Sequence, residues 1–227
     1  MARKKRFNLA GVTQLVVQSS PGADRFLQDS GDHQHFRHCL ECASMRSETL
    51  VHAYSLAASK VAFLVTPTRT GGVSLIMQSL GRRYANHFYS KYHGQRVPWR
   101  PRYIAFPVEP GCLTLASYAY IENLPVSDGL ARSESLYPWS SFHANTTGNI
   151  PSWITPHPEI EKLGDNPAIR ARVYSDRFDD LVRQLRAPVE SAIACNAALG
   201  SPGFITQLEQ ICQFRLTPGK PGRPKVV

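Results

Sequence analysis

Arginine and lysine side chains alternate with aromatic ones between positions 82 and 103 of this chain. Cationic groups bind phosphates, and exposed rings stack on unpaired bases. Tyr84 and Phe88 have helical spacing and are expected to face a core, which leaves Tyr89 and Tyr92 for exposure. The pattern predicts contact with single-stranded DNA or DNA hairpin ends. The predicted contacts in this segment are Arg82, Arg83, Tyr89, Lys91, Tyr92, Arg96 and Arg102.

The carboxyl-terminal tail is a second predicted DNA contact. It is rich in proline, glycine and lysine, and its Gly-Arg-Pro core resembles an AT-hook, which places arginine in the minor groove. Lys220, Arg223 and Lys225 are the residues expected to reach DNA. A net charge of +9, from 26 Lys and Arg against 17 Asp and Glu, favours a polyanionic partner. A basic protein whose tails are merely hydrated is the alternative.

A group of histidines and cysteines lies at His33, His35, His38, Cys39 and Cys42. Zinc sites require a second ligand pair at a characteristic spacing, and the chain has none. We therefore expect buried thiols beside solvated imidazoles here, and no metal. The chain has five cysteines, an odd number without a repeated spacing, which predicts reduced and mostly buried thiols.

The order of the expected elements indicates the fold. Strands are expected at 11–18, 50–56, 60–66 and 102–108, and helices at 31–47, at 74–88 with Ser74 as a possible N-cap, and at 113–121. This β-α-β-β-α-β order is the split βαβ arrangement. It predicts an α+β, ferredoxin-like fold, in which helices cover one face of an antiparallel sheet and an extra helix follows the last strand.

Changes in composition divide the chain into four parts. We expect a basic arm at 1–10, the main domain at 11–145, a helical extension at 146–214 and a Pro/Gly tail at 215–227. Short helices are expected in the extension at 166–178, 181–198 and 203–212. Apolar runs are too short for a membrane span, and the amino terminus lacks a secretory pattern, so a cytoplasmic location is expected.

Four motifs resemble, in the same order, those of REP-associated tyrosine transposases, IS200-like members of the HUH superfamily. They are Met77–Tyr84 (MQSLGRRY), Tyr118–Val126 (YAYIENLPV), Tyr137–Phe142 (YPWSSF) and Thr155–Pro158 (TPHP). The resemblance spans roughly residues 7–164 and places Tyr120 on the extra helix. It implies DNA transposition and DNA recombination by a bacterial, nucleoid-associated protein that binds hairpin or single-stranded repetitive palindromic DNA. A homodimer is possible.

The resemblance also implies the chemistry. In active members a tyrosine, here Tyr120, attacks a DNA phosphate to give a 5′-phosphotyrosine. A phenol with a pKa of about 10 is a weak nucleophile, so Mg²⁺ or Mn²⁺ is essential. Two histidines and an amide hold that metal, and their positions are Lys60, Ala62 and Leu124 in this chain. Alanine and leucine cannot ligate a metal, and lysine only donates hydrogen bonds.

Asn123 lies one residue before the amide position, and one helical step rotates a side chain by about 100°, so it should point elsewhere. The sequence thus predicts a transposase-like pseudoenzyme that binds DNA without a metal cofactor. Three alternatives stay open: an active nickase and strand transferase that uses Tyr120 with Lys60 near the phosphate, a non-catalytic DNA-binding regulator, and a decayed product that binds little. Tyr120 could equally be a packed aromatic residue of the helix.

Overall fold

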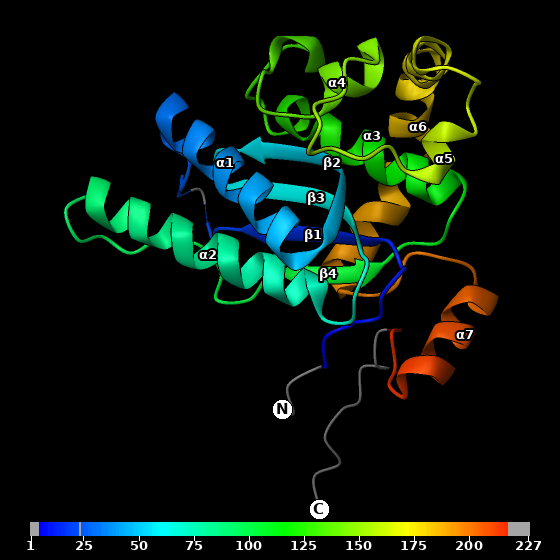
Figure 1. Ribbon diagram of the computed structural model, residues 1–227, viewed down its shortest axis with the longest axis horizontal. Helices are drawn as coiled ribbons and strands as arrows, with labels where there is room; N and C mark the ends of the chain where they lie inside the picture. The colour runs from blue at the N-terminus through cyan, green and yellow to red at the C-terminus, as the bar shows by residue number, and fades with distance from the viewer. Residues whose placement is uncertain (1–4, 23, 218–227) are drawn as a thin grey trace, which may run out of the picture.

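A computed structural model describes residues 5–22 and 24–217 and arranges them around one sheet (Figure 1). The strands are β1 (Gln14–Ser19), β2 (Thr49–Ala57), β3 (Lys60–Pro67) and β4 (Ile104–Pro107). The helices are α1 (Ser30–Ser47), α2 (Gly72–Lys91), α3 (Cys112–Ser127), the 3₁₀ turn η1 (Glu134–Leu136), α4 (Phe142–Thr147), α5 (Pro158–Glu161), α6 (Pro167–Cys195) and α7 (Pro202–Cys212).

The sheet has the strand order β2-β3-β1-β4, and every neighbouring pair is antiparallel. The central strand β1 aligns Val17 with Ala62 of β3 and with Ile104 of β4. A two-residue turn at Ala58 and Ser59 joins β2 to β3. This is the topology that the order of elements predicted, and the mixed antiparallel fold is confirmed.

Side chains alternate between the two faces of the sheet, and each face has its own apolar core. Val61 and Phe63 of β3 point into a cluster formed with α1 and α2, whereas Ala62 and Leu64 point into a cluster formed with α3 and α6. Figure 1 shows α1 and α2 in front of the sheet and α6 passing behind it. The extra helix, α3, therefore occupies the face opposite the two helices of the split βαβ unit.

Local capping explains where the first two helices begin. Asp29 caps α1 by accepting a 2.9 Å hydrogen bond from the amide of Asp32. The start of α2 was expected near Ser74, but Gly71 with φ of 81° is the N-cap. The turn is set by close packing, because a Cβ on the next residue, Gly72, would lie 2.7 Å from Pro67 Cβ. A side chain there would push α2 away from β3.

The carboxyl-terminal helices differ from the prediction. The expected helices at 166–178 and 181–198 form one continuous helix, α6, of 29 residues. Its buried side chains Tyr174, Phe178, Val189 and Ala192 keep helical spacing across the expected break, so packing against α3 sustains one helix. The last helix, α7, packs on the amino-terminal segment through a cluster of Phe7, Leu208 and Leu216.

The five cysteines are free thiols, and only Cys39 is buried. The prediction that most are buried is wrong, because Cys112 and Cys195 lie at the first residue of α3 and the last residue of α6, where helix ends meet solvent. Within residues 5–22 and 24–217, no helix has the length and apolarity that crossing a membrane requires.

Candidate functional site

Tyr120 is a buried residue of α3, the helix that packs against the sheet and against α6. Its side chain is 8% exposed and belongs to the same buried cluster as Ala62 and Leu124. Burial, with smaller contributions from Glu190 and Asp128, raises the pKa of the Tyr120 phenol to about 12. The hydroxyl therefore stays protonated at neutral pH, although the nearby Arg186 guanidinium offsets part of the rise.

Two of the three positions assigned to metal ligands by resemblance, Ala62 and Leu124, belong to the same buried cluster as this tyrosine. Ala62 is fully buried and Leu124 is 1% exposed. Lys60 is half-buried, and its Nζ is 3.2 Å from Oδ1 of Asp128, the C-cap residue that follows α3. Among the residues that the structure describes, no group of three His, Cys, Asp or Glu side chains could hold a metal ion.

Asn123 points away from this cluster, as the helical rotation predicted. Its amide nitrogen donates a 2.6 Å hydrogen bond to Glu134 of η1. Its oxygen accepts a 3.3 Å hydrogen bond from Arg186 of α6. Asn123 therefore connects α3 to η1 and to α6.

A buried carboxylate two residues after Tyr120 was missed by the sequence reasoning. Glu122 is fully buried and accepts hydrogen bonds from Ser141 Oγ at 2.5 Å, Asn145 Nδ2 at 2.6 Å and Tyr174 Oη at 2.8 Å. Burial raises the pKa of Glu122 to about 7, although these three donors lower it. The acidic residue inside the apolar sequence Tyr-Ile-Glu-Asn-Leu was the signal that could have found it.

Glu122 connects α3 to its neighbours through hydrogen bonds. Its partners come from α4 with its N-cap residue Ser141 and from the first third of α6, so one carboxylate joins three segments. Such a buried polar network fixes geometry only while every donor is paired. The orientation of the helix that carries Tyr120 therefore depends on Glu122.

The predicted DNA contacts on α2 and its exit loop divide into two groups. Arg82 and Arg96 are exposed, Arg83 is half-buried, and the Tyr89 ring is 58% exposed. Tyr84 and Phe88 are buried, as their spacing predicted. Arg46 and Arg69, which the sequence reasoning did not select, line the same hollow as Arg82 beside the junction of α1 and α2.

Lys91 and Tyr92 form the second group and are engaged inside the protein. The ammonium of Lys91 lies 2.7 Å from Asp29 and 2.8 Å from Asp32, and the Tyr92 hydroxyl donates to Asp32 at 2.6 Å. Burial alone would raise the pKa of Asp32, but these donors, the Gln28 amide and His87 lower it to about 2. Tyr92 is only half-buried, so the expected exposure is partial, and DNA contact by both residues stays a prediction.

The other histidines of α1 have separate partners. His33 stacks on Trp139 with 5.2 Å between ring centres, and His35 stacks on His87 at 4.0 Å. His38 Nε2 lies 3.6 Å from Cys42 Sγ. The expectation of solvated imidazoles is therefore wrong for His33, which is buried at the start of α1 with its ring nitrogen 2.7 Å from Asp29 O, whereas His35 is half-buried and His38 is exposed.

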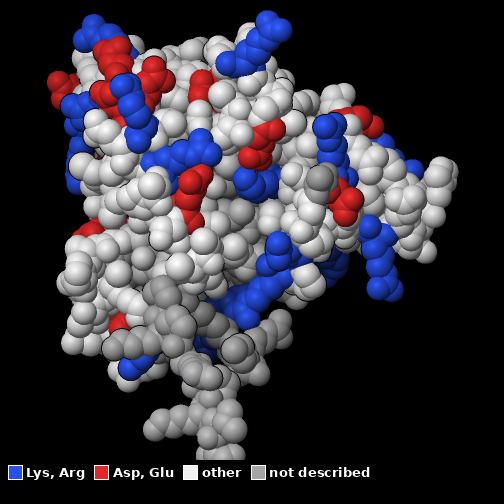
Figure 2. All heavy atoms as spheres, turned by 180° about the vertical axis from the view of Figure 1, so that it is seen from behind, with Lys and Arg blue, Asp and Glu red and all other residues white. Residues whose placement is uncertain are grey.

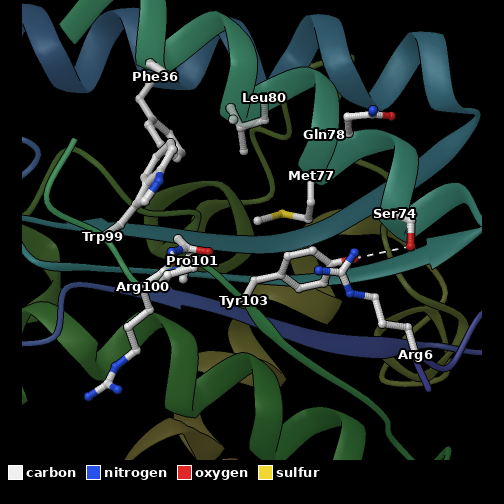
Figure 3. Close-up of a pocket in the computed structure, with 13 residues that line it drawn as sticks. Arg6, Phe36, Ser74, Met77, Gln78, Leu80, Trp99, Arg100, Pro101 and Tyr103 are labelled. Carbon is white, nitrogen blue, oxygen red and sulfur yellow. Dashed lines mark hydrogen bonds between the residues drawn. The ribbon is translucent and has the colours of Figure 1, made fainter. Parts of the chain in front are cut away.

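A groove of about 570 Å³ lies between α2 and the segment that precedes β4 (Figure 3). Met77 and Leu80 point into it from α2, and Trp99 and Tyr103 border it from the other side. We call it the α2 groove. The complete set of lining residues is Arg6, Gln18, Phe36, Ser74, Met77, Gln78, Leu80, Gly81, Ala85, Trp99, Arg100, Pro101 and Tyr103.

Positive charge is also present on the opposite side of the molecule. Figure 2 shows some Lys and Arg side chains in a band below the middle of that side and others higher up, among most of its acidic side chains. Arg102 is half-buried on the segment before β4. Lys220, Arg223 and Lys225 lie outside the described residues, so their predicted role is untested.

Comparisons with known proteins bear on the fold. The chain is similar to a REP-associated tyrosine transposase solved bound to a REP hairpin, with a TM-score of 0.56 and 16% identity over 70% of this chain and 93% of that one. It also matches a transposase candidate from Deinococcus radiodurans R1, with a TM-score of 0.38 and 15% identity over 48% and 88% of the two chains. No protein-family profile and no curated protein matches. The first likeness shows a shared transposase fold.

Proposed function

We propose that this chain is a transposase-like DNA-binding protein that recognises hairpin or single-stranded DNA of a repetitive palindromic kind. We further propose that it derives from HUH-type tyrosine transposases and has lost metal-dependent cleavage. The shared fold supports the first part, since the similar structure was solved with a REP hairpin. A cytoplasmic, nucleoid-associated location belongs to the same proposal.

Exposed cations and an exposed ring on α2 and its exit loop support DNA binding. Arg82 and Arg96 are free to approach phosphates, and the Tyr89 ring is exposed enough to stack on a base. Loss of one phosphate contact lowers the salt dependence of single-strand affinity by a slope of about 0.7. Binding through these groups is therefore measurable one arginine at a time.

The observation that carries the loss of cleavage is the apolar packing around Tyr120. The metal of active relatives would polarise the scissile phosphate and stabilise its developing charge. Ala62 and Leu124 provide no ligating atom and are sealed in the core beside Tyr120, so the residues present do not fit a divalent ion. Lys60 provides one ammonium, which is already paired with Asp128.

Equilibrium binding to labelled DNA tests recognition. We expect tighter binding to a palindromic hairpin than to a scrambled strand of equal length and composition. Arg82→Gln and Arg96→Gln should each weaken binding and reduce its salt dependence. Arg172→Gln is the matched control, because Arg172 is exposed on α6, which packs on the opposite face of the sheet. Equal affinity for hairpin and scrambled strands would contradict hairpin recognition.

A further inference from the structure

We propose that the α2 groove is a binding site for one unpaired nucleobase of single-stranded DNA. This inference rests on the proposed function and adds to it a site that reads bases in addition to phosphates. The volume of about 570 Å³ lies within the range of about 300–1,000 Å³ that is usual for small-molecule sites. The groove can therefore hold a base together with its sugar.

The walls of the groove suit a flat aromatic ligand. Trp99 is half-buried and is held by an edge contact with Phe26 at 5.7 Å and by a tilted contact with Tyr84 at 5.9 Å between ring centres. The floor consists of Met77 and Leu80, which are 8% and 1% exposed. A base stacked beside a fixed indole and over a methionine sulfur would gain stacking and dispersion energy at little cost in side-chain entropy.

The polar groups of the rim suit a nucleotide better than an apolar peptide. Gln78 is exposed, and its amide can both donate to and accept from a base edge. The Ser74 hydroxyl lies 3.3 Å from the Tyr103 hydroxyl, so both are oriented at one end of the groove. None of the lining residues is acidic.

Two arginines bracket the groove where the backbone of a bound strand would enter and leave. The Arg6 guanidinium lies 4.3 Å from the centre of the Tyr103 ring, and Figure 3 shows it over that ring. Arg100 lies at the other end, with its guanidinium pointing away from α2. The Arg100 backbone is fixed by 2.8 Å hydrogen bonds with Ser19 O and the Gln18 amide. The arginines at the two ends suit the phosphates of a bound strand, and the aromatic rings along the groove suit a base inserted between them.

Gly81 provides a way to fill the groove without removing any charge. It lies on the groove side of α2, and an added Cβ would lie 3.9 Å from Trp99, which is ordinary contact. Gly81→Leu should therefore occupy the space beside Trp99 while α2 remains intact. Gly81→Ala is the matched control, because it improves helix propensity and leaves most of the volume open.

The experiment measures the affinity of the full chain for a labelled DNA hairpin with and without a single-stranded oligo(dT) extension. A series of extensions carries an abasic site at each position in turn. In the wild type and in Gly81→Ala, one abasic position should weaken binding about tenfold, as expected for one stacked base. In Gly81→Leu, the intact extension should bind about tenfold more weakly, the abasic series should be flat, and the blunt hairpin should bind as in the wild type.

Photocrosslinking of the wild type gives a second readout that needs no variant. A 5-iodouracil at the sensitive position should crosslink to the peptide that contains Trp99 and Tyr103 or to the one that contains Met77. A crosslink elsewhere, or equal loss of blunt-hairpin binding in Gly81→Leu, would overturn the inference. If the wild type binds the hairpin and neither the abasic series nor Gly81→Leu changes the affinity, the nucleobase site in the α2 groove is refuted while the proposed DNA-binding function stands. If the wild type binds neither DNA, the proposed function fails with it.

Discussion

Replacing Glu122 with glutamine should change how the stability of the fold depends on pH. The pKa of this buried carboxyl is about 7 in the folded chain and 4.5 in its ordinary state. The folded chain thus holds this proton more tightly than the unfolded chain does. The group contributes stability that is complete below pH 4.5 and is lost as the pH rises through 7.

The size of this effect follows from the shift. One pKa unit corresponds to about 1.36 kcal/mol. The shift from 4.5 to about 7 should therefore lower the free energy of unfolding by about 3 kcal/mol as the pH rises from 4.5 to 7. Glu122→Gln cannot titrate. Its free energy of unfolding, measured relative to the wild type, should therefore rise by about 3 kcal/mol over this range.

His52 provides an internal comparison with the opposite sign. Its imidazole is buried and hydrogen-bonded to Thr155 O at 2.7 Å and Thr66 Oγ1 at 2.8 Å, and burial lowers its pKa to about 4. The stability it contributes is present above pH 6.5 and is lost as the pH falls through 4. The free energy of unfolding of His52→Asn, measured relative to the wild type, should therefore rise by about 3 kcal/mol as the pH falls from 6.5 to 4.

Urea titrations at half-unit pH steps measure both differences directly. Because each difference is taken against the wild type at the same pH, the other titrating groups cancel. Parallel pH profiles of Glu122→Gln and the wild type would refute the burial argument for Glu122. If the free energy of unfolding of Glu122→Gln, measured relative to the wild type, fell as the pH rises from 4.5 to 7, the three hydrogen-bond donors would outweigh burial in setting the pKa of Glu122.

Three further predictions concern packing, the Asp32 cluster and the tail. Ala62→His should lower the free energy of unfolding by about 1–3 kcal/mol, because the fully buried Cβ leaves no space for an imidazole; an unchanged urea midpoint would contradict this packing. Lys91→Met should lower the free energy of unfolding by about 2 kcal/mol, since it leaves the buried Asp32 carboxylate without its ammonium partner. A large loss of DNA affinity at unchanged stability would instead favour Lys91 as a phosphate contact. Deleting residues 218–227 should weaken DNA binding and flatten its salt dependence while keeping the buried Leu216; an unchanged salt slope would exclude phosphate contacts by the tail.

Local patterns in the sequence predicted elements whose residues are close together in the chain. A short apolar run indicated the strand at 60–66, and helical spacing at Phe36, Cys39 and Leu40 indicated α1, both of which are confirmed. The same reasoning failed for α6, where a continuous apolar stripe outweighed the expected break. It also failed at Gly71, since close packing of α2 against β3 sets that turn.

Sites built from distant segments could not be predicted in this way. Lys91 and Asp32 are 59 residues apart, and no local pattern signals that α2 ends beside the start of α1. The α2 groove combines the amino-terminal arm, α2 and the segment before β4, which meet only in the folded chain. The position of Tyr120 beside Ala62 and Leu124 is a similar case, and resemblance alone suggested it.

The proposal that DNA recognition persists without cleavage is tested most directly by a covalent-adduct assay. Wild type and Tyr120→Phe are each incubated with a labelled hairpin plus Mg²⁺ or Mn²⁺, and each sample is resolved on native and denaturing gels. We predict a hairpin-selective shift on the native gel and no labelled protein on the denaturing gel for either chain. A labelled adduct that forms with the wild type and disappears in Tyr120→Phe would contradict the account.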